Sequence, residues 1–509
     1  MRPAGLLRVA FSRAHVLGMS RLGPTLLVLA LLLAPGCATN PVTGQTEFVL
    51  LSAAQEIELG RQSAKQFAEQ LGLVDDPELV TYVAAIGNRL AEHSPRQDVS
   101  YHFQIADQEA PNAFALPGGW IYVSRGALAI SNSEAELAGV IGHEIGHVAA
   151  RHVVQQQTRS IGVGLLTLLG AAVAGAAGGE GAANVVGQLG QVAGAGLIAT
   201  YGRGQELQAD QVGQSLAARD GYDPAGIARF LTSLERDAER RAGGTHRQPS
   251  FFDSHPATER RVEEALERAA TLERGGGRPL SGERSAYLAR LEGLLVGPDP
   301  AAGLFRDERF VHPVLGFGVD FPKGWETQNG RKAVVAAAPD GNRILKLDAG
   351  PVEPDPVKAA AEFAQANRIV LDGGHRLTIG GLDAFRAHAQ VPVQGGNAAL
   401  HLTWIAHRRA GFRFIGVAPA AQAHEAFRKF DAVAASFGPL GKAERASIKE
   451  WRLAVVSARA GESLAGLARR SGNVWELPEL AIANGLAANA SLRAGQPIKI
   501  AREHPFRPR

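Results

Sequence analysis

The chain has 509 residues, 45% of them apolar and 20% charged, and this balance excludes an intrinsically disordered protein. At this length we expect roughly three or four domains, each with its own core. Lysine and arginine number 53 against 50 aspartates and glutamates, so the charge excludes a nucleic-acid partner recognised through a basic surface. A single cysteine excludes an intrachain disulfide framework, so stability must come from packed cores or a bound metal.

The N-terminus is typical of an export signal. Arg21 precedes an apolar run over residues 26–33, which is too short to span a bilayer comfortably. We expect a signal peptide over residues 1–36, and Met19 is an alternative start to Met1.

The signal ends at Ala-Pro-Gly-Cys, residues 34–37, which resembles the lipobox where bacterial lipoproteins are cleaved and their new N-terminal cysteine is acylated. The match implies a lipid on Cys37, and Ala38 after it favours the outer membrane by resemblance to bacterial sorting rules. Because one acyl chain alone holds weakly, firm attachment needs the several chains of a lipoprotein anchor. Ordinary signal-peptide cleavage is the alternative.

Helical and strand-like patterns follow up to residue 157. Apolar side chains recur at helical spacing in two segments, and two shorter runs read as strands. A longer helical pattern opens at Ser133, which with Glu136 has the spacing of a capping box. The sequence predicts helices over 52–70, 76–93 and 133–157, strands over 101–106 and 119–124, and between the strands a loop that contains residues 111–114.

A glycine- and alanine-rich apolar segment occupies residues 161–199. Its most apolar part, residues 161–177, is at the short limit for a membrane span, and its glycines lower helix propensity. We expect a packed or interfacial helical hairpin, with a transmembrane helix as the alternative. If exposed, the segment could also lie against lipid or hold apolar clients.

Glycine and proline punctuate the rest of the chain. Helices are predicted over 220–238 and 258–272, and a Gly/Pro-rich stretch then begins at residues 275–277. Residues 310–437 mix strand-like runs with one or two helices, which favours a compact α+β domain of unknown role.

Residues 143–147 have the form H-E-x-x-H and lie inside the strongest predicted helix. The two histidines, His143 and His147, share one helix face a turn apart, so they can hold one metal ion. Two imidazoles and an oxygen ligand leave zinc a fourth position for water, whose pKa the ion lowers to about 7. Glu144 is then placed to accept the proton of that water.

A pair of carboxylates lies downstream in the run Glu-Leu-Gln-Ala-Asp, residues 206–210. Glu206 is the predicted third ligand. Asp210, one helical turn later, is placed to accept a hydrogen bond from a ligand imidazole and so to fix its tautomer. The alternative is that both residues lie on a solvated helix face.

Together these motifs resemble the Ste-type CAAX prenyl endopeptidase-like zinc metallopeptidases, whose signature is HExxH followed by ExxxD. The resemblance covers residues 40–268 and includes NPVTG, PNAFALPGGWIYVSRGAL, HEIGHVAARH, ELQAD and SHPATERR. It implies a zincin-type (gluzincin) fold, one zinc per chain held by His143, His147 and Glu206, and Glu144 as general base and acid. The subgroup that it looks most like is that of periplasmic beta-barrel assembly-enhancing lipoproteins, with mitochondrial stress proteases more distant.

Two further roles come from the same resemblance. His255 of the His-Pro pair would approach the metal as a self-inhibitory switch, and Arg261 would bind substrate or the oxyanion. Alternatively, His255 and Pro256 only begin a helix that carries Arg261 on its surface. His152 and His246 are interpreted as structural or solvent-facing.

The substrate would bind along a strand edge. By resemblance, the strand at 121–124 and the adjoining loop with Asn112, Ala113 and Phe114 form an edge that aligns an extended peptide through backbone pairing. Backbone pairing recognises extended shape more than sequence, so unfolded or unassembled chains are the expected substrates.

Residues 455–500 resemble a LysM module, in the runs VVSARAGESLAGLARRSG and LAIANGLAANASLRAGQPIKI. The resemblance implies a strand, two short helices and a closing strand, and binding to the N-acetylglucosamine of peptidoglycan. Glu462 and Ser463 stand where the pattern usually has Asp and Thr, so a module used only for packing is the alternative. The chain shows no 34-residue helical repeats after the peptidase-like part, so client recognition by such repeats is not expected.

The predicted fold class is multidomain α+β: a mainly helical zincin-type domain with a small sheet, an α+β middle domain and a small βααβ LysM-like domain. The expected boundaries are a signal peptide over 1–36, the metallopeptidase domain over 37–275, a linker over 276–302, the middle domain over 303–440 and the LysM-like domain over 448–502.

The leading hypothesis is a lipid-anchored zinc metalloendopeptidase in the periplasm, at the outer membrane, that cleaves misfolded or unassembled envelope proteins. Its other expected partners are the membrane, through the lipid, and peptidoglycan, through the LysM-like module. A second hypothesis is an envelope chaperone or assembly factor with a gated, mostly silent zinc site. A third is a cell-wall hydrolase, against which the HExxH and ExxxD signature argues.

Overall fold

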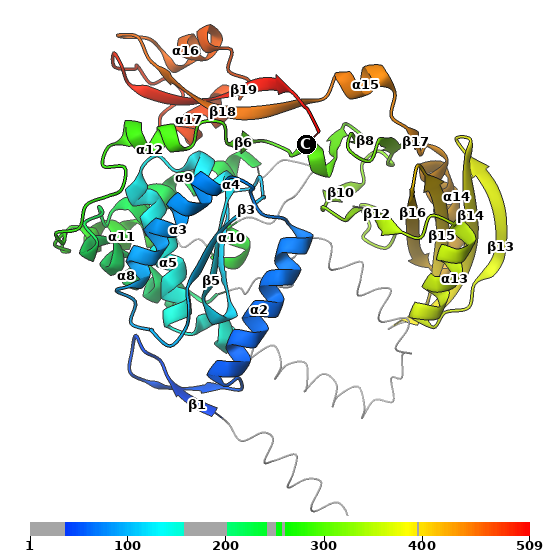
Figure 1. Ribbon diagram of the computed structural model, residues 1–509, viewed down its shortest axis with the longest axis horizontal. Coiled ribbons are helices and arrows are strands. Elements are labelled where there is room, and N and C mark those ends of the chain that lie inside the picture. The colour runs from blue at the N-terminus through cyan, green and yellow to red at the C-terminus, as the bar shows by residue number, and fades with distance from the viewer. Residues whose placement is uncertain (1–35, 157–200, 242–250, 257–259, 394–395, 509) are drawn as a thin grey trace, which may run out of the picture.

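The computed structural model describes residues 36–156, 201–241, 251–256, 260–393 and 396–508. These residues form a helical region up to residue 296, a middle region over 300–446 and a C-terminal module over 449–505 (Figure 1). The predicted signal peptide, the apolar segment at 161–199 and His246 lie outside the described residues. No described helix is both long and apolar enough to cross a membrane.

The helical region is built from helices with well-defined starts. Ser52 closes a capping box at the first turn of its helix, and Asp76 caps the next helix, where Pro77 is the first residue. Its elements are β1 (Gly36–Thr39), β2 (Thr46–Val49), α2 (Ala53–Gln70), α3 (Pro77–Ala91), β3 (His102–Ala106), β4 (Ala113–Leu116), β5 (Trp120–Ser124), α4 (Arg125–Ile130), α5 (Glu134–Ala149), α8 (Arg203–Arg219), α9 (Gly226–Arg241), α10 (Phe251–Ser254), α11 (Arg261–Ala269), α12 (Arg284–Arg290) and β6 (Leu295–Val296).

A three-stranded sheet in this region differs from the prediction in two ways. Ala113–Leu116 forms strand β4, where a loop was expected, and β5 is the central strand, between β3 and β4. The strand at 121–124 is therefore not an edge, and β4 is. All four side chains of β4 are buried, so the apolar and polar alternation that marks a half-exposed strand is missing from its sequence.

The helix that carries the H-E-x-x-H motif is shorter than predicted. Ser133 caps α5 by accepting a hydrogen bond from the backbone N–H of Glu136, and the helix ends at Ala149 rather than continuing to 157. Arg151 has a φ of 60°, a left-handed conformation that ends the helix, and residues 152–156 are helical again. The chain thus turns immediately after the motif.

Helices α5 and α8 pack unusually close, because both have glycines at the crossing. A Cβ on Gly213 would lie 2.6 Å from the backbone nitrogen of His143, and one on Gly146 would lie 2.8 Å from the carbonyl oxygen of Ala209. Only glycine fits such an approach of two backbones. This crossing brings the E-x-x-x-D helix against the H-E-x-x-H helix.

The middle region is a sandwich of helices on a sheet of seven antiparallel strands. Phe363 of α13 and Leu402 belong to one apolar core and Phe430 of α14 and Phe414 to another, so the two helices cover different faces of the sheet. The strand order is β10-β11-β12-β16-β15-β14-β13, and a smaller sheet has the order β17-β9-β8-β7. Its elements are β7 (Leu304–Arg306), β8 (Arg309–His312), β9 (Phe317–Asp320), β10 (Glu326–Asn329), β11 (Ala333–Ala337), β12 (Ile344–Val352), α13 (Pro356–Asn367), β13 (Asp372–Ile379), β14 (Leu382–Val393), β15 (Gly396–His407), β16 (Ala410–Pro419), α14 (Ala423–Ala435), β17 (Gly438–Pro439) and α15 (Lys442–Ala446).

The C-terminal module has the order strand, helix, helix, strand. Its elements are β18 (Lys449–Ser457), α16 (Leu464–Ser471), α17 (Leu477–Ala483) and β19 (Pro497–Pro505). Strand β6 adds to its sheet beside β18. The order is the one expected of a LysM-like module, but kinship to LysM stays a prediction.

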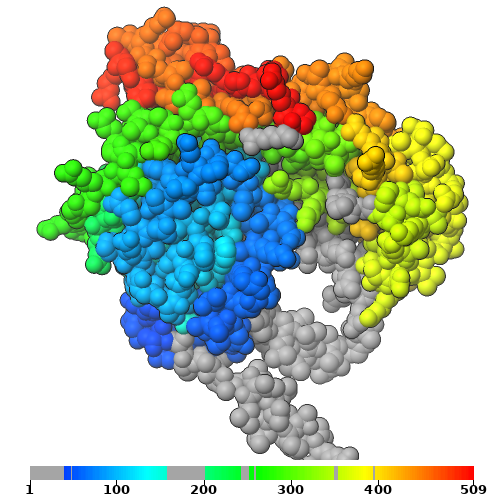
Figure 2. All heavy atoms as spheres, in the orientation of Figure 1, coloured from blue at the N-terminus to red at the C-terminus, as the bar shows by residue number. Residues whose placement is uncertain are grey.

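The segment over 276–302, expected as a linker, contains α12 and β6. Its residues Tyr287, Leu288 and Val296 belong to the same apolar core as the helical region and the module. The module therefore rests directly on the helical region, as Figure 2 shows for the orange and red surface above the green and blue one.

Candidate metal centre

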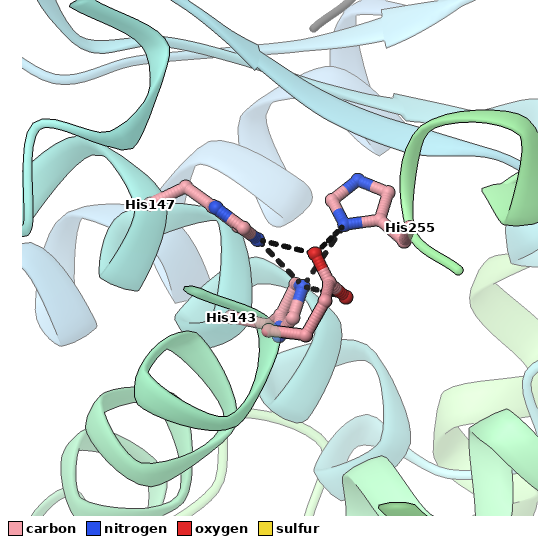
Figure 3. A group of neighbouring side chains, drawn as sticks. His143, His147 and His255 are labelled. Atoms are coloured by element: carbon pink, nitrogen blue, oxygen red, sulfur yellow. Dashed lines mark hydrogen bonds and ion pairs between the residues drawn. The ribbon is translucent and has the colours of Figure 1, made fainter. Parts of the chain in front are cut away.

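Three separate parts of the chain converge on one buried point. Helix α5 supplies His143 and His147, α8 supplies Glu206, and His255 follows directly after α10. One ligand atom from each of the four residues lies within 4.8 Å of all the others, and all four side chains are fully buried. Figure 3 shows the three labelled imidazole rings turned toward one another.

The spacing of these atoms fits a small cation. Nε2 of His147 lies 3.0 Å from Nε2 of His143 and 3.3 Å from Oε1 of Glu206. Nδ1 of His255 lies 3.2 Å from Nε2 of His143 and 3.0 Å from Oε1 of Glu206. Four ligands at about 2.0–2.2 Å around a tetrahedral zinc stand roughly 3.3–3.6 Å apart, so this donor set suits zinc.

His143 is supported by charged groups. Its Nδ1 lies 2.8 Å from Oδ1 of Asp210, and Arg261 donates to both oxygens of Asp210 from Nε and Nη2, each at 2.9 Å. The Nη1 atom of Arg261 also lies 2.6 Å from Oε2 of Glu206. Arg261 is 2% exposed, so the alternative that places it on a helix surface is wrong.

His147 is supported by a second imidazole and an amide. Its Nδ1 lies 3.0 Å from Nδ1 of His152, whose Nε2 lies 2.8 Å from Oε1 of Gln208. The ring of Tyr201 stacks on His147 with ring centroids 3.8 Å apart. His152 is 1% exposed, so it is not solvent-facing.

Glu144 lies beside the cluster rather than in it. Oε1 of Glu144 is 3.6 Å from Nε2 of His255, and among the described residues neither of its oxygens has a hydrogen-bond partner. His255 is held in this place by Phe251, whose ring stacks on it with centroids 4.1 Å apart. An imidazole thus separates Glu144 from the convergent ligand atoms.

The site has more buried negative than positive charge. With the three buried carboxylates of Glu144, Glu206 and Asp210 ionised and the imidazoles neutral, the one buried guanidinium, Arg261, leaves two negative charges to balance. Buried charges are costly unless they are paired or coordinate a metal. A divalent cation among the ligand atoms would supply the two missing charges.

Burial and the neighbouring charges shift the pKa values of the site residues in different directions. Burial raises the pKa of the Glu144 carboxyl, which therefore accepts a proton more readily than an exposed glutamate. Burial also raises the pKa of Glu206, but the neighbouring imidazoles, His255 first, outweigh it and hold that pKa well below its usual range. Burial lowers the pKa of His147 well below its ordinary value, which keeps its ring neutral, as a metal ligand must be.

The structure brings most of the predicted site residues together. Those in the cluster or in contact with it are His143, Glu144, His147, Glu206, Asp210, His255 and Arg261. Asn112, Ala113 and Phe114 are buried at and just before the edge strand β4, and the backbone N–H of Phe251 in α10 donates to the carbonyl of Pro111. Cys37 lies in β1, paired with Phe48 of β2.

The sequence identifies His152 only as structural or solvent-facing, and it gives no sign of Gln208. His152 follows His147 by five residues, and on a continuous helix it would point about 140° away from it. The left-handed residue Arg151 turns the chain back instead. Gln208 lies between the two predicted carboxylates of α8. It can be recognised as a partner only once the position of His152 is known.

Comparisons with known proteins identify the family of this chain. The model of peptidase family M48 matches residues 77–269. Metalloprotease LoiP of Escherichia coli K12 is 30% identical over 219 residues, which are 43% of this chain and 82% of that protein. The chain belongs to peptidase family M48. The family and its named metalloproteases support a metallopeptidase.

Two other relatives are also similar to part of the chain. The beta-barrel assembly-enhancing protease of Escherichia coli K12 is 30% identical over 241 residues, 46% of this chain and 48% of that protein. Mitochondrial metalloendopeptidase OMA1 of Schizosaccharomyces pombe is 26% identical over 226 residues, 44% of this chain and 63% of that protein. The chain thus spans about half the length of the first of these relatives.

Proposed function

We propose that this protein is a zinc metalloendopeptidase of the bacterial envelope, with residues 37–275 as the peptidase domain. The observation that carries the proposal is the convergence of four fully buried ligand atoms beside Glu144. Family membership makes peptide bonds the expected substrate.

His143, His147 and Glu206 are the proposed zinc ligands. Bound zinc supplies Lewis acidity to the scissile carbonyl and to the attacking water. Asp210 and Arg261 hold the ligand side chains in place, Asp210 at Nδ1 of His143 and Arg261 at Oε2 of Glu206. The described contacts give Arg261 this positioning role, and contact with substrate or the oxyanion stays a prediction.

Glu144 is the proposed general base and acid. One of its carboxylate oxygens takes a proton from the attacking water and later gives it to the nitrogen of the leaving amine. Its burial, which raises its pKa, suits both steps, because the protonated form must persist until the peptide bond breaks.

His255 is the proposed gate. In the described arrangement its Nδ1 completes the ligand cluster, and its ring lies between that cluster and Glu144, where water would have to enter. The site is therefore closed to substrate until His255 withdraws. This closure favours one second candidate function, a chaperone or assembly factor whose zinc site is mostly silent.

Misfolded or unassembled envelope proteins are the proposed substrates. Strand β4 is at the edge of its sheet, so an extended chain could add to it by backbone pairing. The side chains of Ala113 and Phe114 are buried, so such pairing would read backbone shape and not these side chains. The name of one relative, the beta-barrel assembly-enhancing protease, supports a role among envelope proteins.

We also propose a lipid anchor at Cys37, a periplasmic location at the outer membrane, and peptidoglycan as a partner of the C-terminal module. Between the module and α12 lies a groove of about 530 Å³ with polar walls, which include Ser285, Arg493 and Gln496. Side chains of this kind suit the hydroxyl and amide groups of a glycan. Co-sedimentation with purified sacculi, reduced in Arg493→Ala, tests the partner.

The test of the peptidase function is cleavage of unfolded casein by the wild type, Glu144→Gln and His255→Ala, with bound zinc quantified in each. We expect cleavage by His255→Ala at least as fast as by wild type, and none by Glu144→Gln even though it keeps its zinc. If none of the three cleaves casein with full zinc, the chaperone function replaces the peptidase function.

A further inference from the structure

The hydrogen bonds that start at Nδ1 of His147 form a chain in which each group can donate to the next. The chain runs from His147 Nδ1 to His152 Nδ1 at 3.0 Å and from His152 Nε2 to Gln208 Oε1 at 2.8 Å. The two histidines are buried and Gln208 is half-buried, so water does not compete freely with these bonds.

The proton positions follow from the last acceptor. An amide oxygen only accepts, so the proton between Gln208 and His152 belongs to Nε2 of His152. A neutral imidazole carries one proton, so Nδ1 of His152 has a lone pair and accepts. His147 then donates from Nδ1, and its lone pair lies on Nε2, the atom that faces His143 and Glu206.

We propose that His152 and Gln208 are positioning residues that hold His147 in the tautomer whose Nε2 binds the metal. The inference rests on the zinc site proposed above and deepens it. His143 is held in the corresponding tautomer by a different group, because its Nδ1 faces the carboxylate of Asp210. One ligand is thus oriented by a charged pair and the other by a neutral relay.

The turn after α5 builds this relay. Arg151, with its φ of 60°, donates from Nη2 to Oε2 of the buried Glu56 at 3.2 Å. Glu56 also forms a two-bond pair with Arg96, at 2.9 and 2.8 Å, and Arg96 donates to the carbonyl of Val148 near the end of α5. The turn is therefore anchored by buried ion pairs, and His152 is fixed facing His147.

The experiment measures zinc affinity of the full-length protein by competition with a chelator, with thermal unfolding of each metal-free variant alongside. His152→Phe removes the acceptor and should weaken zinc binding about 10- to 100-fold. His152→Asn restores an acceptor near the position of Nδ1 and should recover most of the affinity. His424→Phe is the control, because His424 is exposed on α14 in the middle region.

A second pair of variants decides the matter if His152→Phe fails to fold. Gln208→Met removes the amide oxygen and should weaken zinc binding. Gln208→Glu keeps an acceptor at the same place and should bind zinc like the wild type.

Three results would overturn the inference. The first is wild-type affinity in a folded His152→Phe, the second is equal weakening by His152→Asn and His152→Phe, and the third is equal affinity of the two Gln208 variants. A wild type that binds no zinc would instead overturn the proposed metal site, and with it this inference.

Discussion

The C-terminal module and the middle region both follow the helical region in the chain, but they relate to it differently. Leu453, Leu480 and Ile500 of the module share one apolar core with the helices that surround the metal centre. The middle region has its own cores on the two faces of its sheet, and among the described residues it shares only a small apolar cluster, Val311, Leu440 and Ile448, with the start of the module. The middle region is thus adjacent to the helical region in sequence but folds around separate cores. The C-terminal module is distant in sequence but belongs to the same folding unit as the helical region.

The helical region also makes different kinds of contact with the module and with the middle region. Nζ of the fully buried Lys499 donates to the carbonyls of Ala129 and Ser131, at 2.7 and 2.5 Å, just before the helix that carries the H-E-x-x-H motif. The middle region meets the helical region around a cavity of about 100 Å³, with Asp107 and Arg331 in its wall. The first boundary is therefore part of a core, and the second is a polar surface contact.

The largest effect is expected from deleting one region or the other. A chain that ends at residue 447 loses the module and exposes the shared core, so we expect it to be insoluble or unfolded, because a typical domain has a stability of only about 5–15 kcal/mol. Replacing residues 303–446 with a short Gly/Ser linker should leave a soluble protein. Thermal unfolding and zinc content of both proteins check this, and a stable first protein would contradict the shared core.

Lys499→Met tests the same boundary with one side chain. The variant keeps the apolar stem but leaves two buried carbonyls without their donor, so we expect a loss of about 3 kcal/mol in the free energy of unfolding. Lys449→Met is the control, because the side chain of Lys449 is 40% exposed. Urea unfolding curves that shift equally for both variants would contradict the account.

Acid should weaken the middle region through its buried histidines. Burial lowers the pKa of His312 to about 4, below its ordinary value of 6.5, so between these values the unfolded chain binds a proton that the folded chain does not. Stability is therefore full above pH 6.5 and falls as pH drops toward 4, by up to about 3 kcal/mol. Unfolding of the middle region at pH 7.5 and 4.5 measures the loss, and an equal loss in His312→Asn would show that other groups cause it.

The smallest effect is expected at the tip of the β10–β11 hairpin. Arg331 lies 4.0 Å from Asp107, and Lys332 lies 3.2 Å from Glu69, with both cationic side chains about half exposed. Exposed pairs of this kind contribute roughly 0–1 kcal/mol each. The double variant Arg331→Ala, Lys332→Ala should unfold within a few degrees of the wild type in calorimetry, and a large shift would make this contact part of the folding unit.

Much of the candidate site follows from the sequence, because helical spacing alone places ligands on a face. His143 and His147 one turn apart, and Glu206 and Asp210 one turn apart, are each predictable in this way. The starts of α2, α3 and α5 are also predictable, since Ser52, Asp76 and Ser133 cap them.

What the sequence does not reveal depends on turns and on contacts between distant segments. The end of α5 at Ala149 follows from a left-handed arginine, a conformation that no residue pattern marks. Strand β4 is hidden because its side chains are all buried. The packing of residues 276–302 into the shared core was missed because the glycines and prolines at both ends of the segment mark it as a connection.

The most direct test of the metal centre is anomalous scattering at the zinc edge from crystals of the full-length protein grown with zinc. We expect one peak per chain, bounded by His143, His147 and Glu206, with Nδ1 of His255 as the fourth neighbour in the closed state. A peak elsewhere, or none between these residues in a folded chain, would contradict the zinc site on which the proposed function depends.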